Sequence, residues 1–547
     1  MSERFIVTAT PPTPNGDFHV GHLSGPYLGA DIFTRFQRMR GHTVTYVSSA
    51  DRNQSYVVTT AERKGVDPDS LSTFSHSEMI KTLNAGRIAM DAFNMVDSTH
   101  VELVQGFMRV VESRGHVKRK VKKFPYSSEQ GRFLVESYVA GHCPECWSPT
   151  AGAICEACGH PNDFSTLELA RPSAGAGPIE IREIEIAVLE LEAFRPEFER
   201  FYASKVGVWR PHILEFAREM LAHRLPDYPL TYPSDWGIPS PLDGYDGQVL
   251  NVWAEMLPGL INSTAVAFDM TGKGRAAGTE LWEAGSGARL IQFLGYDNSF
   301  FFAFVHLALA WAHGDCQAAD TILTNEFFEL ENFKFSTSKN HLIWARDLLA
   351  ERPVDTVRFY LALANPEYQK MNFTMEAMDT LVDVRLLKPF AGAIDGLARA
   401  ASHLGRLEKT FMVSASTAKR LCKAFDRFAY FYTIETFSPQ RAAEHLSQLL
   451  VRMGAGTTAI CSQSMPHEAA LAEYEYLAGL LQVVLPSVTL PLMPDFSEQL
   501  AGTVGRVGAG VWPQVLEGIE LGLQEEQLAR ARQILLLEKS PDLRKAS

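Results

Sequence analysis

The chain has 547 residues, of which 46% are hydrophobic and 21% are charged. This composition excludes a disordered protein and predicts a soluble globular protein of several domains. The net charge of −13 argues against a generally basic nucleic-acid binder, although a local basic groove is compatible with it. The first residues lack a basic and apolar leader pattern, so we expect no export signal. The longest apolar runs are Phe300 to Ala312, which is too short to span a bilayer, and Tyr476 to Met493, which is interrupted by prolines. We therefore expect a cytoplasmic protein without a membrane partner.

The first elements are a strand, a turn and a helix that begins with two histidines. Phe5 to Thr8 is apolar, a turn rich in Pro and Gly follows, and Leu23 to Arg40 has apolar residues at helical spacing. His19 and His22 stand three residues apart, so their rings share one face. Beside the positive end of a helix, they would stabilise negative charge on a phosphate. The alternative is a capped surface helix with two incidental histidines.

Strand and helix continue to alternate up to about residue 115. Thr43 to Val47 predicts the second strand, and Asp51 follows it. The alternation favours an α/β fold with a doubly wound parallel sheet, in which ligands bind at the carboxyl ends of the strands. Asp51 is therefore a candidate to bind a substrate ammonium group, and its alternative role is that of a turn or N-cap residue.

The alternation breaks between about 116 and 230. Lys118 to Lys123 is basic, and Gly131 to Val139 predicts a strand. Two C-x-x-C pairs follow, made of Cys143, Cys146, Cys155 and Cys158. Each pair makes a tight knuckle, and two knuckles complete a tetrahedral Cys₄ set, as in closed structural zinc sites. We expect structural Zn²⁺ and a reducing compartment instead of disulfides.

Further signals follow downstream. VLNVWAEMLPGLI places Trp253 after a strand, and FLGYDN places Gly295 and Asp297 after the next one. Phe333 to Lys339 is a loop with two lysines and three hydroxyls, which by itself could be a solvated turn. Residues 391–547 are helical by pattern.

Five blocks resemble methionyl-tRNA synthetases, which belong to the class I aminoacyl-tRNA synthetases. They occur in the family's order and span residues 1–390: TPNGDFHVGHLSGPYLGADIFTRFQRMRGHTVTYV, CPEC…CEAC at 143–158, VWAEMLPG at 252–259, FLGYDN at 293–298 and FKFSTSK at 333–339. The resemblance implies a Rossmann-like sheet with an inserted zinc-knuckle domain, followed by an all-α helical bundle. The implied domains are the first half of the catalytic domain (1–115), the connective insertion (116–230), the second half (231–325), a stem-contact region with the signature loop (326–390) and a helical anticodon-binding-like domain (391–547).

The resemblance also implies an ATP-dependent ligase that forms an aminoacyl-adenylate with the help of Mg²⁺. The implied catalytic residues are His19, His22, Lys334 and Lys339, and the implied ATP-binding residues are Asn15, Gly21, Gly295, Asp297, Ser336, Thr337 and Ser338. The family usually has a second lysine inside the loop, where Thr337 stands here. We expect Lys339, or Lys334 with the two serines, to take over the stabilisation of the leaving pyrophosphate.

The implied amino-acid pocket departs from the family. Its residues are Pro11, Thr13, Asp51, Trp253, Leu260, Asn298, Phe302 and His306. A methionine pocket should be apolar and aromatic, but Pro11, Thr13 and Leu260 replace a family Leu and two Tyr. Asn298 and His306 stand eight apart in an apolar stretch, so one helix face would present both to a substrate unless they are satisfied internally. The pocket therefore predicts an amino acid other than methionine.

The helical domain also departs from the family, which usually shows an Asn and an Arg on its first helix and a later Trp. Gly396 and Ala400 stand in the first two places, and the stretch 455–468 has no Trp. Residues 391–547 carry 15 Lys and Arg against 16 Asp and Glu, a net charge of −1, which is a poor footprint for tRNA. Helical packing is the favoured interpretation of this domain.

Three hypotheses for function remain open. The favoured one is that the adenylate of an amino acid other than methionine is trapped by a small amine or hydroxylamine in natural product biosynthesis, beside a separate partner enzyme of the pathway. The second is conventional charging of methionine tRNA. The third is a non-catalytic binding paralog, which the retained H-x-G-H motif and hydroxyl-rich loop disfavour.

Overall fold

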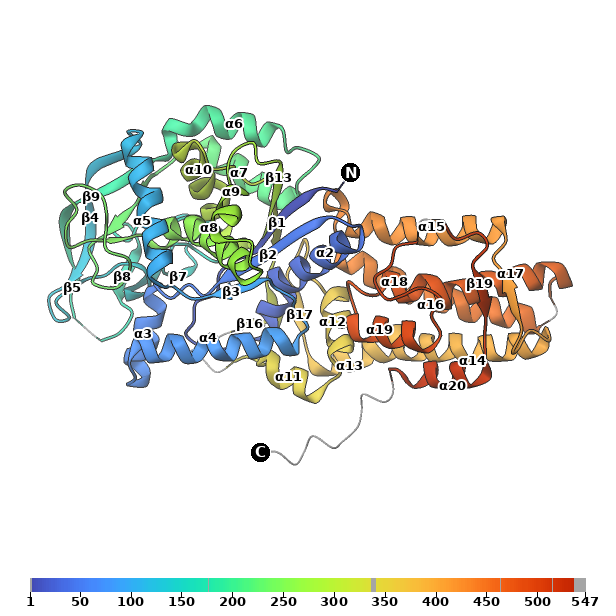
Figure 1. Ribbon diagram of the computed structural model, residues 1–547. Helices are drawn as coiled ribbons and strands as arrows, with labels where there is room; N and C mark the ends of the chain where they lie inside the picture. Colours follow the sequence, from blue (N-terminus) through green and yellow to red (C-terminus); the bar gives the residue numbers. More distant parts are fainter. Residues whose placement is uncertain (1, 176, 336–340, 463, 514, 536–547) are drawn as a thin grey trace. The chain divides into compact units, whose positions relative to one another are not determined.

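The structure, a computed structural model, describes residues 2–535 except 176, 336–340, 463 and 514. The chain forms two compact units (Figure 1). Unit 1 comprises Met1–Phe18, Thr43–Leu83 and Ala89–Phe327, and unit 2 comprises His19–His42, Asn84–Ile88 and Phe328–Ser547. Among the helices in the described ranges, none combines the length and apolar character that crossing a bilayer requires.

A five-stranded parallel sheet forms the centre of unit 1. Its strands lie in the order β14-β13-β1-β2-β3, with the bounds Arg4–Ala9 (β1), Thr43–Ser49 (β2), Ala92–Asn94 (β3), Ala288–Gly295 (β13) and Thr321–Asn325 (β14). Ile6 of β1 lies opposite Thr45 of β2 and Leu290 of β13. The chain order reverses between β1 and β13, as in doubly wound nucleotide-binding folds. The two predicted strands are confirmed, since apolar runs of this kind are buried on both faces of a parallel sheet.

Helices pack against this sheet within unit 1. α8 (Val252–Met270) lies against β2 and β3, and α5 (Ser98–Ser113) and α9 (Arg275–Glu280) pack on α8 (Figure 1). The other helical segments are α3 (Ser55–Lys64), α4 (Pro68–Ala85), the 3₁₀ turn η4 (Tyr296–Asn298), the π-helical η5 (Phe301–His306) and α10 (Leu307–His313). The stretch from Asn298 to His306 is helical but is not one regular α-helix, because it begins in the 3₁₀ turn and ends in the π-helical segment.

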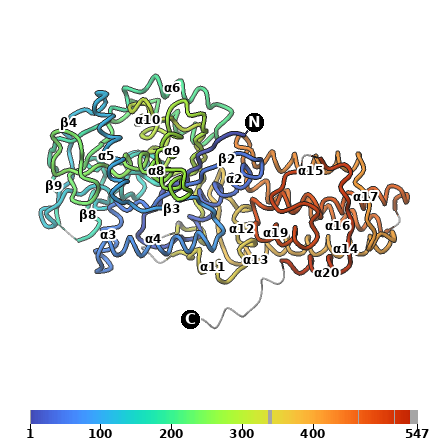
Figure 2. Tube along the Cα trace, viewed as in Figure 1, coloured from blue at the N-terminus to red at the C-terminus, as the bar shows by residue number. Residues whose placement is uncertain are grey.

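An insertion of two small antiparallel sheets follows α5, and Figure 2 traces it until the chain returns to α8. One sheet has the order β10-β9-β4-β5, with β4 at Val117–Ser127, β5 at Arg132–Phe133, β9 at Glu180–Glu190 and β10 at Asp227–Pro229. The other has the order β7-β6-β8, with β6 at Val139–His142, β7 at Pro149–Ala151 and β8 at Glu168–Pro172. The remaining elements are η3 (Leu191–Phe194), α6 (Arg195–Ala203), α7 (Pro211–Ala222) and the short pair β11 (Thr231–Tyr232) and β12 (Val249–Leu250).

The strand predicted at 131–139 is interrupted. Glu136–Tyr138 forms a 3₁₀ turn, η2, between β5 and β6. Glu136 has a φ of 53°, and the backbone N–H of Ser137 donates to Oγ of Ser55 at 3.0 Å. This backbone amide therefore bonds to helix α3 instead of a strand ladder, which local sequence could not reveal.

The helix predicted at 23–40 begins earlier and is kinked. α1 (Val20–His22) continues through the π-helical η1 (Leu23–Tyr27) into α2 (Leu28–Met39). Gly25 leaves helical geometry with a ψ of −118°, and Pro26 follows it. The side-chain amide of Asn365 donates to the backbone oxygen of Ser24 at 2.7 Å, which satisfies a carbonyl at the kink.

A buried ion pair joins α2 to α12 (Val354–Leu363) in unit 2. Nη2 of Arg358 lies 2.7 Å from Oδ2 of Asp31, and the two side chains are 1% and 0% exposed. Arg358 also donates to the backbone oxygens of Gly86, Pro491 and Leu492. A buried guanidinium requires such complete hydrogen bonding, so Arg358 organises three segments that are distant in sequence.

The helical character predicted for 391–547 is confirmed for the described part, which ends at residue 535. α14 (Lys388–His403), α16 (Pro439–Cys461) and α17 (His467–Gly479) pack on one another (Figures 1 and 2). The other helical elements of unit 2 are α11 (Ala345–Glu351), α13 (Met375–Val382), η6 (Asp383–Leu387), α15 (Ala415–Tyr432), η7 (Ile434–Thr436), η8 (Leu480–Val484), α18 (Leu485–Val488), α19 (Pro494–Thr503) and α20 (Glu525–Gln533). Its short strands are β15 (Phe328–Leu330), β16 (Phe333–Lys334), β17 (Met371–Phe373), β18 (Thr410–Met412) and β19 (Glu520–Gly522).

Candidate active site

The two histidines of unit 2 form a contiguous pair at the start of α1. Their ring centroids are 3.8 Å apart. The backbone N–H of His19 donates to Nδ1 of His22 at 3.3 Å. Because Nδ1 accepts this hydrogen bond, the neutral His22 ring carries its proton on Nε2, where it can be donated.

The histidine pair meets the segment that leads into the lysine- and hydroxyl-rich loop. The ring of Phe335 stacks on that of His19, with a centroid distance of 4.9 Å and an angle of 11°. A Cβ at Gly21 would lie 3.0 Å from the His19 ring and 3.5 Å from Phe335, so glycine permits this approach. Beyond the loop, the backbone N–H of Val20 donates to the oxygen of Ile343 at 3.0 Å. Two motifs separated by some 300 residues in sequence are thus brought together within one unit.

The predicted loop residues are only partly described. The backbone of Lys334 pairs with that of Glu329 in the β15–β16 ladder. The other predicted loop residues, Ser336, Thr337, Ser338 and Lys339, lie outside the described residues.

In unit 1, the end of β13 carries the predicted ribose-binding turn. Gly295 is the last residue of the strand, and Asp297 lies in the following 3₁₀ turn. A Cβ at Gly295 would lie 2.6 Å from Oδ1 of Asp297, so a larger residue here would displace this carboxylate. Burial raises the pKa of Asp297 to about 6, and the side-chain amide of Asn298 donates to Oδ1 at 2.9 Å. Asn298 is therefore already engaged within the protein.

Asp51 lies just beyond β2 beside a network that sequence reasoning missed. Both oxygens of Glu255 accept hydrogen bonds from Nδ2 of Asn53, at 2.9 and 3.0 Å, and Oε1 also lies 2.9 Å from Nε2 of His100. Burial raises the pKa of Asp51 well above its usual range, and the charges of Glu255 and Glu136 raise it further. A bound cation would stabilise the charged form of Asp51 and lower its pKa, so the site is compatible with ammonium binding. The signal available in the sequence was a charged residue, Glu255, inside the apolar helix that begins at Val252.

Trp253 precedes Glu255 by two residues in the sequence. It lies in the first turn of α8, and its ring stacks on Phe301 with a centroid distance of 3.8 Å. Nε2 of His306 donates to the backbone oxygen of Trp253 at 3.0 Å, and burial lowers the pKa of His306 to about 4. His306 is therefore a neutral side chain with one nitrogen satisfied internally, which agrees with the alternative left open for it.

The other predicted pocket and nucleotide residues also lie in unit 1. The amide of Asn15 donates to Oγ1 of Thr60 at 3.4 Å. Thr13 is partly buried, and the buried members of the set are Pro11, Leu260 and Phe302.

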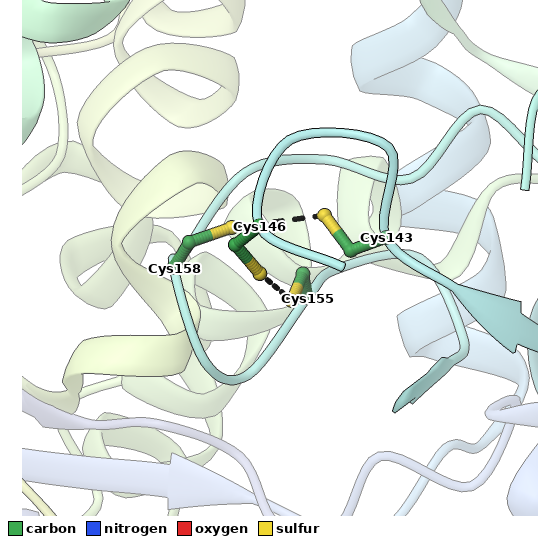
Figure 3. Close-up of side chains that lie close together, drawn as sticks. All are labelled: Cys143, Cys146, Cys155 and Cys158. Carbon is green, nitrogen blue, oxygen red and sulfur yellow. Dashed lines mark hydrogen bonds between the residues drawn. The ribbon is translucent and has the colours of Figure 1, made fainter. Parts of the chain in front are cut away.

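The four cysteines converge as their spacing predicted (Figure 3). Their sulfur atoms all lie within 4.8 Å of one another, with 3.8 Å between Cys143 and Cys158 and 3.6 Å between Cys146 and Cys155. A tetrahedral zinc ion with Zn–S bonds of about 2.3 Å requires sulfurs about 3.8 Å apart, so the set fits such an ion.

The sequence of this chain is similar to a known protein family and to several of its members. Residues 5–395 match the family model described as tRNA synthetases class I (M). A methionine–tRNA ligase of Roseiflexus sp. (strain RS-1) is 31% identical over 384 residues, which cover 68% of this chain and 64% of that protein. The enzyme of the same name from Chlorobium chlorochromatii is 32% identical over 389 residues, 68% of this chain and 54% of its own. The chain thus spans between about half and two thirds of the length of these two relatives.

A third relative and a solved structure extend the comparison. The methionine–tRNA ligase of Rubrobacter xylanophilus is 32% identical over 403 residues, 71% of this chain and 69% of its own. Methionyl-tRNA synthetase of Mycobacterium tuberculosis, bound by methionyl-adenylate, has a TM-score of 0.72 at 19% identity, covering 96% of this chain and 100% of that one. The structural likeness extends over nearly the whole fold.

Proposed function

Because the chain belongs to the class I tRNA synthetases of the methionyl type, we propose that it is an AMP-forming ligase that activates an amino acid with ATP. The carboxylate oxygen of the amino acid attacks the α-phosphorus, the bond to the β-phosphate oxygen breaks, and aminoacyl-adenylate and pyrophosphate result. The observation that carries this proposal is the contact of His19 with Phe335, which joins the histidine motif to the segment bearing the lysine loop.

The proposed catalytic roles follow from the chemistry of phosphoryl substitution, in which positioning and charge stabilisation dominate. His19 and His22 would stabilise the negative charge that develops on the α-phosphate, and the placement of the His22 proton on Nε2 supports this role. Lys334, Lys339 and the hydroxyls of 336–338 would hold the pyrophosphate as it leaves. Mg²⁺ is the proposed accompanying ion, because it is the usual partner of phosphate oxygens.

Further residues are proposed to bind the substrates. Asp297 would accept hydrogen bonds from the ribose hydroxyls of ATP, and its position directly after a parallel strand supports this. Asp51 would bind the α-ammonium group of the amino acid beside Trp253. A structural Zn²⁺ on the four cysteines is supported by the sulfur spacing.

For the amino acid, we propose a substrate other than methionine. The support is the replacement of apolar and aromatic groups by Pro11, Thr13 and Leu260, together with the buried acidic groups near Asp51. A thioether offers no donor to such carboxylates, whereas a more polar side chain does.

For the acceptor, we propose a small amine or hydroxylamine. Gly396 and Ala400 face the interior of the helical domain, where a Cβ on Gly396 would lie 2.1 Å from Oγ1 of Thr457. Base-reading side chains at these positions would have no access to a single strand of RNA, and the domain is nearly neutral. Transfer to tRNA is the second candidate, favoured by the names of the relatives.

Amino-acid-dependent ATP–pyrophosphate exchange tests the proposed activation. All twenty amino acids and their hydroxylated or N-oxidised variants should be compared, and exchange with none of them would refute the ligase assignment. The fastest exchange with methionine would refute the substrate proposal alone. Charging of bulk tRNA should be run beside trapping by hydroxylamine, and robust, anticodon-dependent charging of methionine tRNA would favour the second candidate.

A further inference from the structure

Glu136 is a buried carboxylate that the proposed roles do not use. It lies in the turn η2 and is only 3% exposed. Among the residues that the structure describes, neither of its oxygens accepts a hydrogen bond. The indole of Trp253, the hydroxyl of Tyr232 and the backbone N–H of Ala153 face it and partly lower its pKa, without completing a bond of good geometry. A buried carboxylate with two unsatisfied acceptors lacks a donor that a ligand can supply.

The contrast with Glu255 shows what is missing. Glu255 is equally buried, but Asn53 and His100 provide three hydrogen-bond contacts to its carboxylate. The three donors that face Glu136 complete no such hydrogen bond, and burial raises its pKa to about 7. Glu255 therefore has a structural explanation within the fold, whereas Glu136 does not.

The surroundings of Glu136 are acidic. Burial raises the pKa values of Asp51 and of three tyrosines, Tyr56, Tyr228 and Tyr232, and the charge of Glu136 raises them further. Within the described residues, the groups that shift the pKa values of Asp51 and Glu136 include no lysine or arginine. A positively charged ligand group would therefore be favoured here over a neutral or anionic one.

The backbone at Glu136 is strained. The φ of 53° at Glu136 lies in the left-handed region, which non-glycine residues rarely adopt. Hydrogen bonds of Ser137 hold the turn. Its backbone N–H donates to Oγ of Ser55, and its own Oγ lies 3.3 Å from Oγ1 of Thr59. Strained backbone that is fixed by its neighbours is typical of functional sites.

We propose that Glu136 binds a primary ammonium group of a substrate, in addition to the α-ammonium group proposed for Asp51. This inference rests on the proposed function and names the chemical class of one of its substrates. An ammonium group carries three donors and a positive charge, which suits two empty carboxylate oxygens beside Trp253. The group comes either from the side chain of a diamino acid or from the acceptor amine, and the test below separates these sources.

The test is calorimetric binding to the full chain without ATP. In the first arm, ornithine is compared with norvaline, which has the same carbon skeleton without the second amine. In the second arm, n-propylamine is titrated in the presence of saturating norvaline, with n-propanol as its neutral match. A preference for the amine of about tenfold or more is expected in one arm, the scale of one charge-assisted hydrogen bond.

Variants connect this preference to Glu136. Glu136→Gln keeps the shape and removes the charge, so it should abolish the preference. The control is Glu185→Gln, which removes an exposed carboxylate of unit 1 that is paired with Arg119 and should leave the preference unchanged. A lost preference for ornithine identifies the side chain as the source, and a lost preference for propylamine identifies the acceptor.

Several outcomes would overturn the inference. Wild-type protein without an amine preference in either arm would do so, as would an undiminished preference in Glu136→Gln. If that variant does not fold, Glu136→Asp keeps the charge and shortens the side chain, so a reduced preference supports the inference and an unchanged one refutes it. Pyrophosphate exchange is measured separately, so its absence refutes the proposed ligase activity without altering these binding ratios.

Discussion

Removing the buried guanidinium of Arg358 should strongly destabilise unit 2. Arg358→Met preserves most of the side-chain volume but eliminates the 2.7 Å contact with Asp31, whose carboxylate is fully buried. It also leaves the backbone oxygens of Gly86, Pro491 and Leu492 without this donor. Breaking one side of a buried pair costs about 3–5 kcal/mol. We expect the lower part of this range, because Arg35 still donates to Asp31 at 2.8 Å.

Arg352 provides a matched control. Its Nε and Nη2 both lie 2.9 Å from the carboxylate oxygens of Asp379, so the pairing geometry is as good as that of Arg358. The two side chains are 33% and 50% exposed, however, and such surface pairs contribute about 1 kcal/mol or less. Arg352→Met should therefore reduce the free energy of unfolding by much less than Arg358→Met.

Equilibrium urea unfolding, followed by circular dichroism, measures both variants. Amide hydrogen exchange then localises the loss, which for Arg358→Met should fall on residues 28–39 and 354–363. If the two substitutions lower the free energy of unfolding equally, the reasoning from burial is refuted. Loss of exchange protection only outside these two helices would refute the assigned contacts.

Three further predictions concern the site. His22→Ala should reduce ATP–pyrophosphate exchange by about 10²–10³-fold, the typical effect of removing one charge-stabilising donor. His403 is exposed, so His403→Ala should leave the exchange rate unchanged. Equal exchange rates in the two variants would count against the histidine mechanism. Elemental analysis should find about one zinc per chain in wild type and a clear loss in Cys143→Ser, whereas zinc-free fresh protein would exclude the site. Burial raises the pKa of Asp297 from 3.8 to about 6, so the folded state binds more protons than the unfolded chain between these values. Stability should therefore fall as pH rises from about 4 to 6, and Asp297→Asn should flatten this slope; an identical slope in both proteins would contradict the assignment.

Short-range patterns were sufficient where the structure depends on neighbours in sequence. The strands β1 and β2 follow from apolar runs bounded by turns, and their burial in a parallel sheet agrees with that pattern. The two C-x-x-C pairs converge because each pair closes its own knuckle within four residues. The histidine pair is likewise local, since His19 is the N-cap residue of α1, His22 is its third residue and their ring centroids lie 3.8 Å apart.

Local periodicity was misleading where distant contacts decide the backbone. The pattern of 131–139 predicts a strand. The backbone N–H of Ser137 donates instead to the hydroxyl oxygen of Ser55, and the segment forms a turn. The helix expected at 23–40 is kinked at Gly25, and the carbonyl of Ser24 is satisfied by Asn365, more than 300 residues away. The local sequence of 131–139 does not reveal the bond to Ser55, and that of 23–40 does not reveal the bond to Asn365.

The sequence by itself determined the α/β class, the cysteine site and the motif that starts α1, because each depends on spacing within a few residues. Only the tertiary structure decided which carboxylates are satisfied. Glu255 acquires Asn53 and His100 from two other segments, whereas neither oxygen of Glu136 accepts a completed hydrogen bond from the described residues. The physical reason is that burial and hydrogen bonding are properties of the assembled interior, and two glutamates with similar sequence surroundings differ once distant chain segments converge on them.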